Sequence, residues 1–190
     1  MVGAAPSFSE AHVIRAMLLL DGKVVGRKKL LKMLEVGEGS MRTILKRLKR
    51  QGLIKSSKQG HTLTPQGKQK LQKILEKFTR PQETKLYDLA PDKIQSLLVV
   101  KNASPKLKAG VFERDVALKA GADGAVILVK RSSQVGFPTD DLSLTEFPVT
   151  QKRVEELNLS DGDVVVISFA TTKAKAEDGA ISVALTLMQQ

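Results

Sequence analysis

The residues best suited to chemistry lie between positions 40 and 50, where five cationic side chains accompany two hydroxyls. A guanidinium group can donate two hydrogen bonds to one guanine edge, and cationic side chains in general attract phosphate oxygens. This stretch therefore predicts contacts with a nucleic acid. Predicted base contacts come from Ser40, Arg42, Thr43 and Lys46, and predicted phosphate contacts from Arg47 and from Lys49 or Arg50.

A second polar group follows Gly52. Residues 53–58 and 61–63 are predicted as a short hairpin, with Gln59-Gly60 as its turn. We take His61 as an incidental residue at the tip rather than as a pH switch. The hairpin would offer four side chains to phosphates or a minor groove: Lys55, Lys58, Gln59 and His61.

Helical periodicity predicts the elements that position these residues. Residues 40–51 place four apolar side chains on one face, and Gly52 ends this helix. A helix over 27–35 precedes it across a Gly-containing turn, which gives the helix-turn-helix pattern. A first helix, with Ser7 and Glu10 at capping-box spacing, and a helix opened by Thr64-Pro65 complete the unit. The last helix carries an apolar stripe from Leu71 to Phe78, which packs within the unit or serves pairing between copies.

The run LKRLKRQGLIKSSKQGHTLTPQGKQKL resembles the MarR-like winged-helix transcription regulators. The features that carry the resemblance are the basic recognition helix, Gly52-Leu53-Ile54, the short wing and Leu63-Thr64-Pro65-Gln66-Gly67. It covers residues 7–79 and implies a winged helix-turn-helix that binds duplex DNA.

The distribution of charge agrees with a polyanionic partner. The chain has 190 residues and a net charge of +11. Residues 1–80 hold 18 Lys/Arg and 5 Asp/Glu, a net charge of +13, whereas residues 81–190 hold 13 and 15, a net charge of −2. A domain this basic attracts nucleic acid and releases its counterions. The alternative from charge alone is a Lys-rich surface that keeps the protein in solution.

Several classes of protein are disfavoured. The chain has no cysteine and two histidines, so we expect no disulfide and no metal site. There is no phosphate-binding G-x-x-x-x-G-K-[ST] loop and no Ser/His/Asp constellation, so we expect no catalytic residues, no cofactor and no enzyme. Without a run of 18 apolar residues or a secretory signal, we expect a cytoplasmic protein with no membrane partner.

The second half predicts a small α+β domain. We expect a winged-helix DNA-binding domain over 1–80, a linker over 81–92 and an α+β effector-sensing or dimerisation domain over 93–190. The expected elements of the last are strands at 94–100, 125–129, 135–137, 164–170 and 181–188, with helices at 111–119 and 150–157, the latter capped by Thr150.

The most unusual stretch of this half is Glu113-Arg114-Asp115 followed by a Gly-rich turn into a strand. Such a turn can shape a ligand pocket, and an effector site would use Arg114, Asp115 and Asp123. We favour the structural alternative, in which Gly121 ends a helix, Asp123-Gly124 turns and Arg114 pairs with a neighbouring acid. The stretch is similar to the C-terminal domains of uncharacterised archaeal winged-helix proteins.

The sequence therefore predicts a DNA-binding transcription regulator whose partners are double-stranded DNA, a small-molecule effector and a second copy of the chain. A homodimer is expected because one recognition helix reads only a few base pairs. Two alternatives stay open: an RNA-binding or translation-associated protein, and an enzyme whose site would lie among Glu113, Arg114, Asp115 and Asp123.

Overall fold

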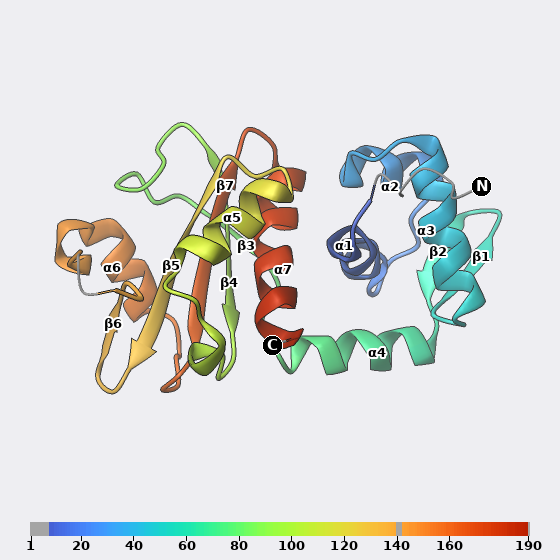
Figure 1. The fold of residues 1–190 in the computed structure, drawn as a ribbon. Helices are drawn as coiled ribbons and strands as arrows, with labels where there is room; N and C mark the ends of the chain where they lie inside the picture. Colours follow the sequence, from blue (N-terminus) through green and yellow to red (C-terminus); the bar gives the residue numbers. More distant parts are fainter. Residues whose placement is uncertain (1–7, 140–141, 190) are drawn as a thin grey trace, which may run out of the picture. The chain divides into compact units, whose positions relative to one another are not determined.

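The computed structural model describes residues 8–139 and 142–189. The chain divides into two compact units, of which unit 1 ends at Leu75 and unit 2 begins at Glu76 (Figure 1). Unit 1 is mostly helical with a two-stranded hairpin, and unit 2 is a five-stranded sheet with helices. This confirms the predicted α+β fold.

Unit 1 follows the predicted order of elements. They are α1 (Glu10–Leu20), α2 (Arg27–Leu34), α3 (Glu38–Arg50), β1 (Ile54–Ser57), β2 (Gly60–Leu63) and α4 (Pro65–Leu75). The antiparallel register pairs Ser57 with Gly60, so the hairpin turn is Lys58-Gln59, one residue earlier than predicted.

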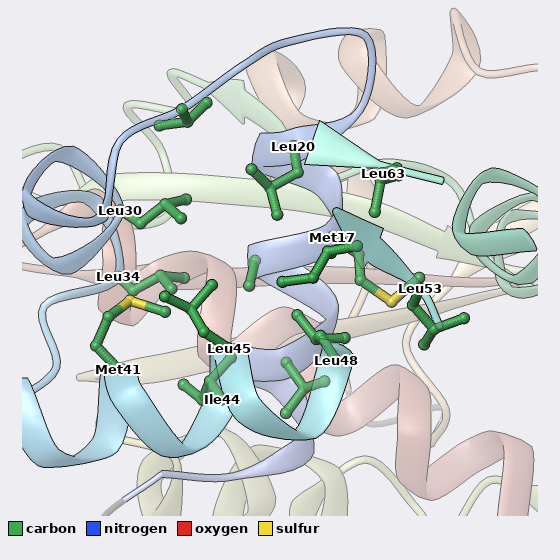
Figure 2. Close-up of a cluster of buried hydrophobic side chains, with 14 of the residues drawn as sticks. Met17, Leu20, Leu30, Leu34, Met41, Ile44, Leu45, Leu48, Leu53 and Leu63 are labelled. Atoms are coloured by element: carbon green, nitrogen blue, oxygen red, sulfur yellow. The ribbon is translucent and has the colours of Figure 1, made fainter. Parts of the chain in front are cut away.

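One apolar core holds unit 1 together. Figure 2 shows α3 directing Met41, Ile44, Leu45 and Leu48 toward α1, α2 and the start of the hairpin. These four side chains are at most 8% exposed, because residues at i, i+3, i+4 and i+7 share one helical face. The same geometry leaves the opposite face of α3 to solvent.

Local caps fix the helix ends of unit 1. The Ser9 N–H donates to His12 Nδ1 at 3.1 Å, so the cap of α1 is Ser9, whereas Ser7 lies outside the described residues. Burial and then the nearby Arg15 lower the pKa of His12. Gly52 follows α3 with φ +69°, as predicted. Thr64 caps α4 as predicted, since its Oγ1 accepts from Gly67 N–H at 3.0 Å.

Unit 2 is built on an antiparallel sheet with strand order β3-β4-β7-β5-β6. Its elements are β3 (Gln82–Thr84), β4 (Ile94–Val100), α5 (Val111–Lys119), β5 (Gly124–Arg131), β6 (Gln134–Gly136), α6 (Pro148–Glu155), β7 (Val164–Ala170) and α7 (Lys173–Gln189), with short 3-10 turns η1 (Ser104–Lys106) and η2 (Leu144–Glu146). Strands β4 and β7 and helix α5 have the bounds that the sequence predicts.

Two layers cover the sheet of unit 2. Helices α5 and α7 pack on one face, and α6 lies on the other (Figure 1). Under α6 the core includes Val99, Leu128, Val154 and Val165. On the α7 face, a Cβ at Gly179 would lie 2.8 Å from Ala122 Cβ and closer still to Ser168 Oγ on β7, so helix and sheet approach closely only without a side chain there.

The prediction of a last strand at 181–188 is wrong, because these residues form the second half of α7. Ile181, Val183 and Leu187 are buried against the sheet, and β-branched residues in a helix are acceptable where packing outweighs propensity.

The predicted linker over 81–92 is also wrong. Residues 82–84 pair with β4 as β3, and Leu86 is 1% exposed in the core of unit 2. The buried Gln95 amide binds the backbone of Leu86 and Ala90, which fixes the segment. The pairing with β4 depends on residues distant in the sequence, so the sequence of residues 81–92 does not by itself predict a strand. The boundary accordingly falls after Leu75, because Phe78 already bridges to Val100.

Helix α6 starts at Pro148, so the prediction that Thr150 caps this helix is wrong. Thr150 is buried, and Asp88 takes the capping role from another part of the chain. Its carboxylate accepts from Val149 N–H at 2.7 Å and Thr150 N–H at 3.0 Å. Burial raises the pKa of Asp88, but the hydrogen bonds from Thr150 and Val149 outweigh it and keep the pKa below its ordinary value.

Candidate nucleic-acid interface

The outer face of α3 is cationic. Arg42, Lys46 and Lys49 are exposed and lie at i, i+4 and i+7, so they form one stripe along the helix. Thr43 and Arg50 flank the stripe and are exposed too. The Thr43 hydroxyl donates to Gly39 O at 3.0 Å, so its oxygen can still accept from outside. Five of the predicted contact residues thus share an accessible surface.

Two predicted contact residues of α3 are placed differently. Ser40 is 9% exposed, because α3 starts at Glu38 and this register turns Ser40 toward the core, so its prediction as a base contact is wrong. Arg47 is about one-third exposed, and its guanidinium lies 2.7 Å from the Glu10 carboxylate. It therefore joins α3 to α1, and a phosphate would have to compete with Glu10.

The hairpin carries the remaining predicted residues. Lys55, Lys58 and Gln59 are exposed, and His61 is partly buried on β2. Its Nδ1 lies 2.9 Å from Ser56 Oγ across the hairpin. We call the α3 stripe and these four hairpin residues together the basic surface.

The start of α2 lies beside the basic surface, although none of its residues is among the predicted contacts. Val25 and His61 exchange backbone hydrogen bonds of 2.9 Å, which brings Arg27 beside the hairpin. A Cβ at Gly60 would lie 2.6 Å from Val25 C, so Gly60 permits this approach. Gly60 has φ +143° in the structure, and the sequence alone does not show that Val25 lies against it.

The charge of unit 1 agrees with this placement. Residues up to Leu75 hold 16 Lys/Arg and 4 Asp/Glu, a net charge of +12. Exposed lysines on α2 and α4 extend the positive field around the basic surface. They are Lys28, Lys29, Lys32, Lys68, Lys70 and Lys73.

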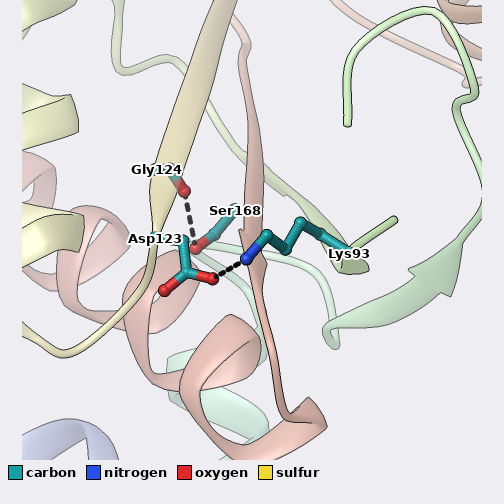
Figure 3. Close-up of polar contacts among 4 residues, drawn as sticks. All are labelled: Lys93, Asp123, Gly124 and Ser168. Atoms are coloured by element: carbon teal, nitrogen blue, oxygen red, sulfur yellow. Dashed lines mark hydrogen bonds and ion pairs between the residues drawn. The ribbon is translucent and has the colours of Figure 1, made fainter. Parts of the chain in front are cut away.

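The residues considered for an effector site in unit 2 do not converge. Asp123 binds Lys93 at 2.7 Å beside the Ser168–Gly124 contact (Figure 3). Arg114 lies 3.7 Å from its neighbour Asp115. Gly121 has φ +95° after α5, as the structural alternative predicts. Glu113 is fully buried, and its Oε1 accepts from Lys108 N–H at 2.9 Å.

A groove of about 710 Å³ lies elsewhere in unit 2, between the β5–β6 hairpin and α6. Its lining includes Phe137, Leu144 and Val154, with Lys130, Arg131 and Glu155 as charged groups. Arg114, Asp115 and Asp123, all among the described residues, do not line it. The volume is in the range of small-molecule sites.

The described residues, 8–139 and 142–189, contain neither a metal-binding cluster nor a helix that could span a membrane. Within them, His, Asp and Glu side chains form no group of three that could hold a metal ion. In the same residues, no helix has the length and apolar character needed to span a bilayer.

Comparison with known proteins gives a consistent family assignment. Residues 12–69 match "PH0730-like, N-terminal domain", and residues 92–187 match "Domain of unknown function (DUF4443)". The first match is to the PH0730-like domain and not to MarR-like regulators, so the MarR-like resemblance stays a prediction. No curated protein matches the chain.

A solved structure is similar over nearly the whole chain. It is the "Hypothetical protein PH0730 from Pyrococcus horikoshii OT3", 35% identical, with a TM-score of 0.80. The match covers 96% of this chain and 94% of that one, and it bears out the predicted similarity to an archaeal protein. The chain therefore belongs to the DUF4443 family and is a relative of Pyrococcus horikoshii PH0730 along almost its full length.

Proposed function

We propose that unit 1 binds duplex DNA through the basic surface and that the protein regulates transcription. The observation that carries this proposal is the division of α3 into two faces. Met41, Ile44, Leu45 and Leu48 anchor the helix in the core, and the Arg42–Lys46–Lys49 stripe stays exposed. A helix held in this way can enter a major groove, where it reads base edges and contacts phosphates.

The test is selection from a randomised duplex library at near-physiological salt, followed by sequencing of the retained fraction. We expect an enriched motif. Retention without enrichment, lost as salt rises, would leave only a polyanion-binding domain. Structured RNA that duplex DNA cannot displace would instead support the RNA-binding alternative.

Arg42 and Lys49 are expected to differ in their roles within the stripe. Arg42 lies in the first half of α3, where recognition helices reach base edges, and Arg42→Ala should cost about 1–3 kcal/mol at one base position. Lys49 lies in the last turn, and Lys49→Ala should weaken all sequences alike and lower the salt slope by about one. Binding of the enriched and of scrambled duplexes as a function of salt measures both. Equal effects of the two variants on the two duplexes would contradict the division.

We also propose that the regulator binds DNA as a homodimer, because α3 alone reads only a few base pairs. Analytical ultracentrifugation of the free protein and of its DNA complex should show two chains in the complex, and the enriched motif should be a palindrome. A monomer both free and on DNA would refute the dimer. A small-molecule effector would fit the groove of unit 2 by volume, whereas Arg114 and Asp123 lie outside it.

A further inference from the structure

His61 lies where β2 meets the segment that leads into α2. It is on β2, and its backbone pairs with Val25 just before α2. The Gly60 Cα allows the Val25-Gly26 backbone to pass close by, since a Cβ there would be 2.8 Å from Gly26 N. The last turn of α3 carries Lys49, whose charge reaches His61.

Two cationic side chains, Arg27 and Lys49, act on the His61 imidazole. Burial lowers the pKa of His61 below 6.5, and the charges of Arg27 and Lys49 lower this pKa further. Among the described residues that pack on β2 from α1 and α4, none supplies a charge that shifts the pKa of His61. Ser56 faces the ring from β1 as a neutral partner. The carboxylate near this cluster is Glu38, 3.5 Å from Arg27 with both side chains about half exposed, where ion pairs are weak.

We propose that Arg27, Lys49 and His61 form a binding site for one backbone phosphate of duplex DNA, and that His61 takes up a proton when the phosphate binds. This inference rests on the proposed function of unit 1. Arg27 and Lys49 supply permanent positive charge, and His61 keeps Nε2 for the phosphate because Nδ1 faces Ser56 Oγ at 2.9 Å. His61 is thus more than an incidental residue of the hairpin tip.

Proton uptake by His61 follows from the change in charge around its ring when the phosphate binds. In the free protein, burial and then the charges of Arg27 and Lys49 lower the pKa of His61, which favours the neutral imidazole. A bound phosphate adds negative charge beside the ring and raises its pKa, which favours the imidazolium. By linkage, DNA affinity must rise as the pH falls through this range, by tenfold for each unit by which DNA raises the pKa of His61.

The test is fluorescence anisotropy with a duplex of random sequence, at constant ionic strength, between about pH 5.5 and pH 8.5. We expect binding severalfold tighter near pH 6 than near pH 8. A one-unit rise in the pKa of His61 gives its full tenfold only at a pH below the pKa of the free histidine. His61→Gln should remove the pH dependence. His12→Gln is the matched control because the chain has two histidines, and it should keep the wild-type pH dependence.

A second measurement needs no variant of His61. Histidine NMR signals, titrated in the free full-length chain and in the DNA complex, should show that DNA raises the pKa of His61 and leaves His12 unchanged. Arg27→Ala and Lys49→Ala should each reduce the salt slope by about one and raise the pKa of His61 in the free protein.

The outcomes separate the two proposals. Duplex binding whose affinity does not change with pH, or a pH dependence that survives His61→Gln, would overturn the phosphate site and leave DNA binding intact. The complete absence of duplex binding at every pH would overturn both.

Discussion

Gly67→Ala is expected to destabilise unit 1 by about 3 kcal/mol, the upper part of the range for overpacking. A Cβ at Gly67 would lie 2.9 Å from Leu53 C and closer still to its carbonyl oxygen. This carbonyl accepts from Thr64 N–H at 3.0 Å, so the Leu53 backbone cannot move away from α4 without weakening that hydrogen bond. The contact is between backbones, and no side-chain rotation can relieve it. Thermal and urea unfolding of the full chain, followed by circular dichroism, measures the change.

The matched control is Gly39→Ala in the first turn of α3. No atom lies within 4 Å of the position that its Cβ would take, and its φ is not in the left-handed region. Alanine favours helix over glycine, so this variant should equal the wild type or gain up to about 1 kcal/mol. If Gly67→Ala proved as stable as Gly39→Ala, the close contact of α4 with Leu53 would be refuted.

The second large effect concerns DNA affinity. Replacing Arg42, Lys46 and Lys49 together by alanine should weaken binding of the enriched duplex by about 100-fold or more, since two predicted base contacts and a predicted phosphate contact are lost. All three side chains are exposed and alanine is a strong helix former, so the variant should stay folded. The salt slope should fall by about two to three. Anisotropy titrations at several salt concentrations give both quantities.

A triple variant of α4 separates recognition from general attraction. Lys68, Lys70 and Lys73 are exposed, and their replacement by alanine removes the same charge from unit 1. We expect a loss of only a few-fold, because these lysines act through the long-range field alone. Equal losses from the two triple variants would show that α3 has no special place in binding.

Periodicity predicts the fold well where local pattern and tertiary packing agree. The four apolar residues of α3 lie in the core as their spacing predicts, and Val111–Lys119 and Val164–Ala170 match their predicted bounds. The failure at 181–188 has a physical cause. A run rich in Ile, Val and Leu is typical of a strand, but here it follows Ala174, Ala176 and Ala180, small residues that let α7 lie flat on the sheet.

The basic surface is predictable in part. Lys55, Lys58, Arg42 and Lys46 are exposed as a contact surface requires, although their contact with DNA stays a prediction. The error at Ser40 arises from a start of α3 two residues earlier than predicted, which turns this side chain inward. Arg27 is absent from the predicted contacts because its position beside His61 depends on the Val25–His61 pairing, a contact between segments more than 30 residues apart.

The strand order of unit 2 has a consequence for how the protein is made. β4 and β5 do not pair with each other, because β7 lies between them, and β7 is the last strand along the chain. On the ribosome, unit 1 has all its helices and its hairpin as soon as Leu75 has emerged. Unit 2 can form only two separate hairpin-like pieces until Val164–Ala170 arrives to join them. Synthesis therefore leaves a period in which unit 1 is complete while β4 and β5 still expose unpaired edges to chaperones and to neighbouring nascent chains.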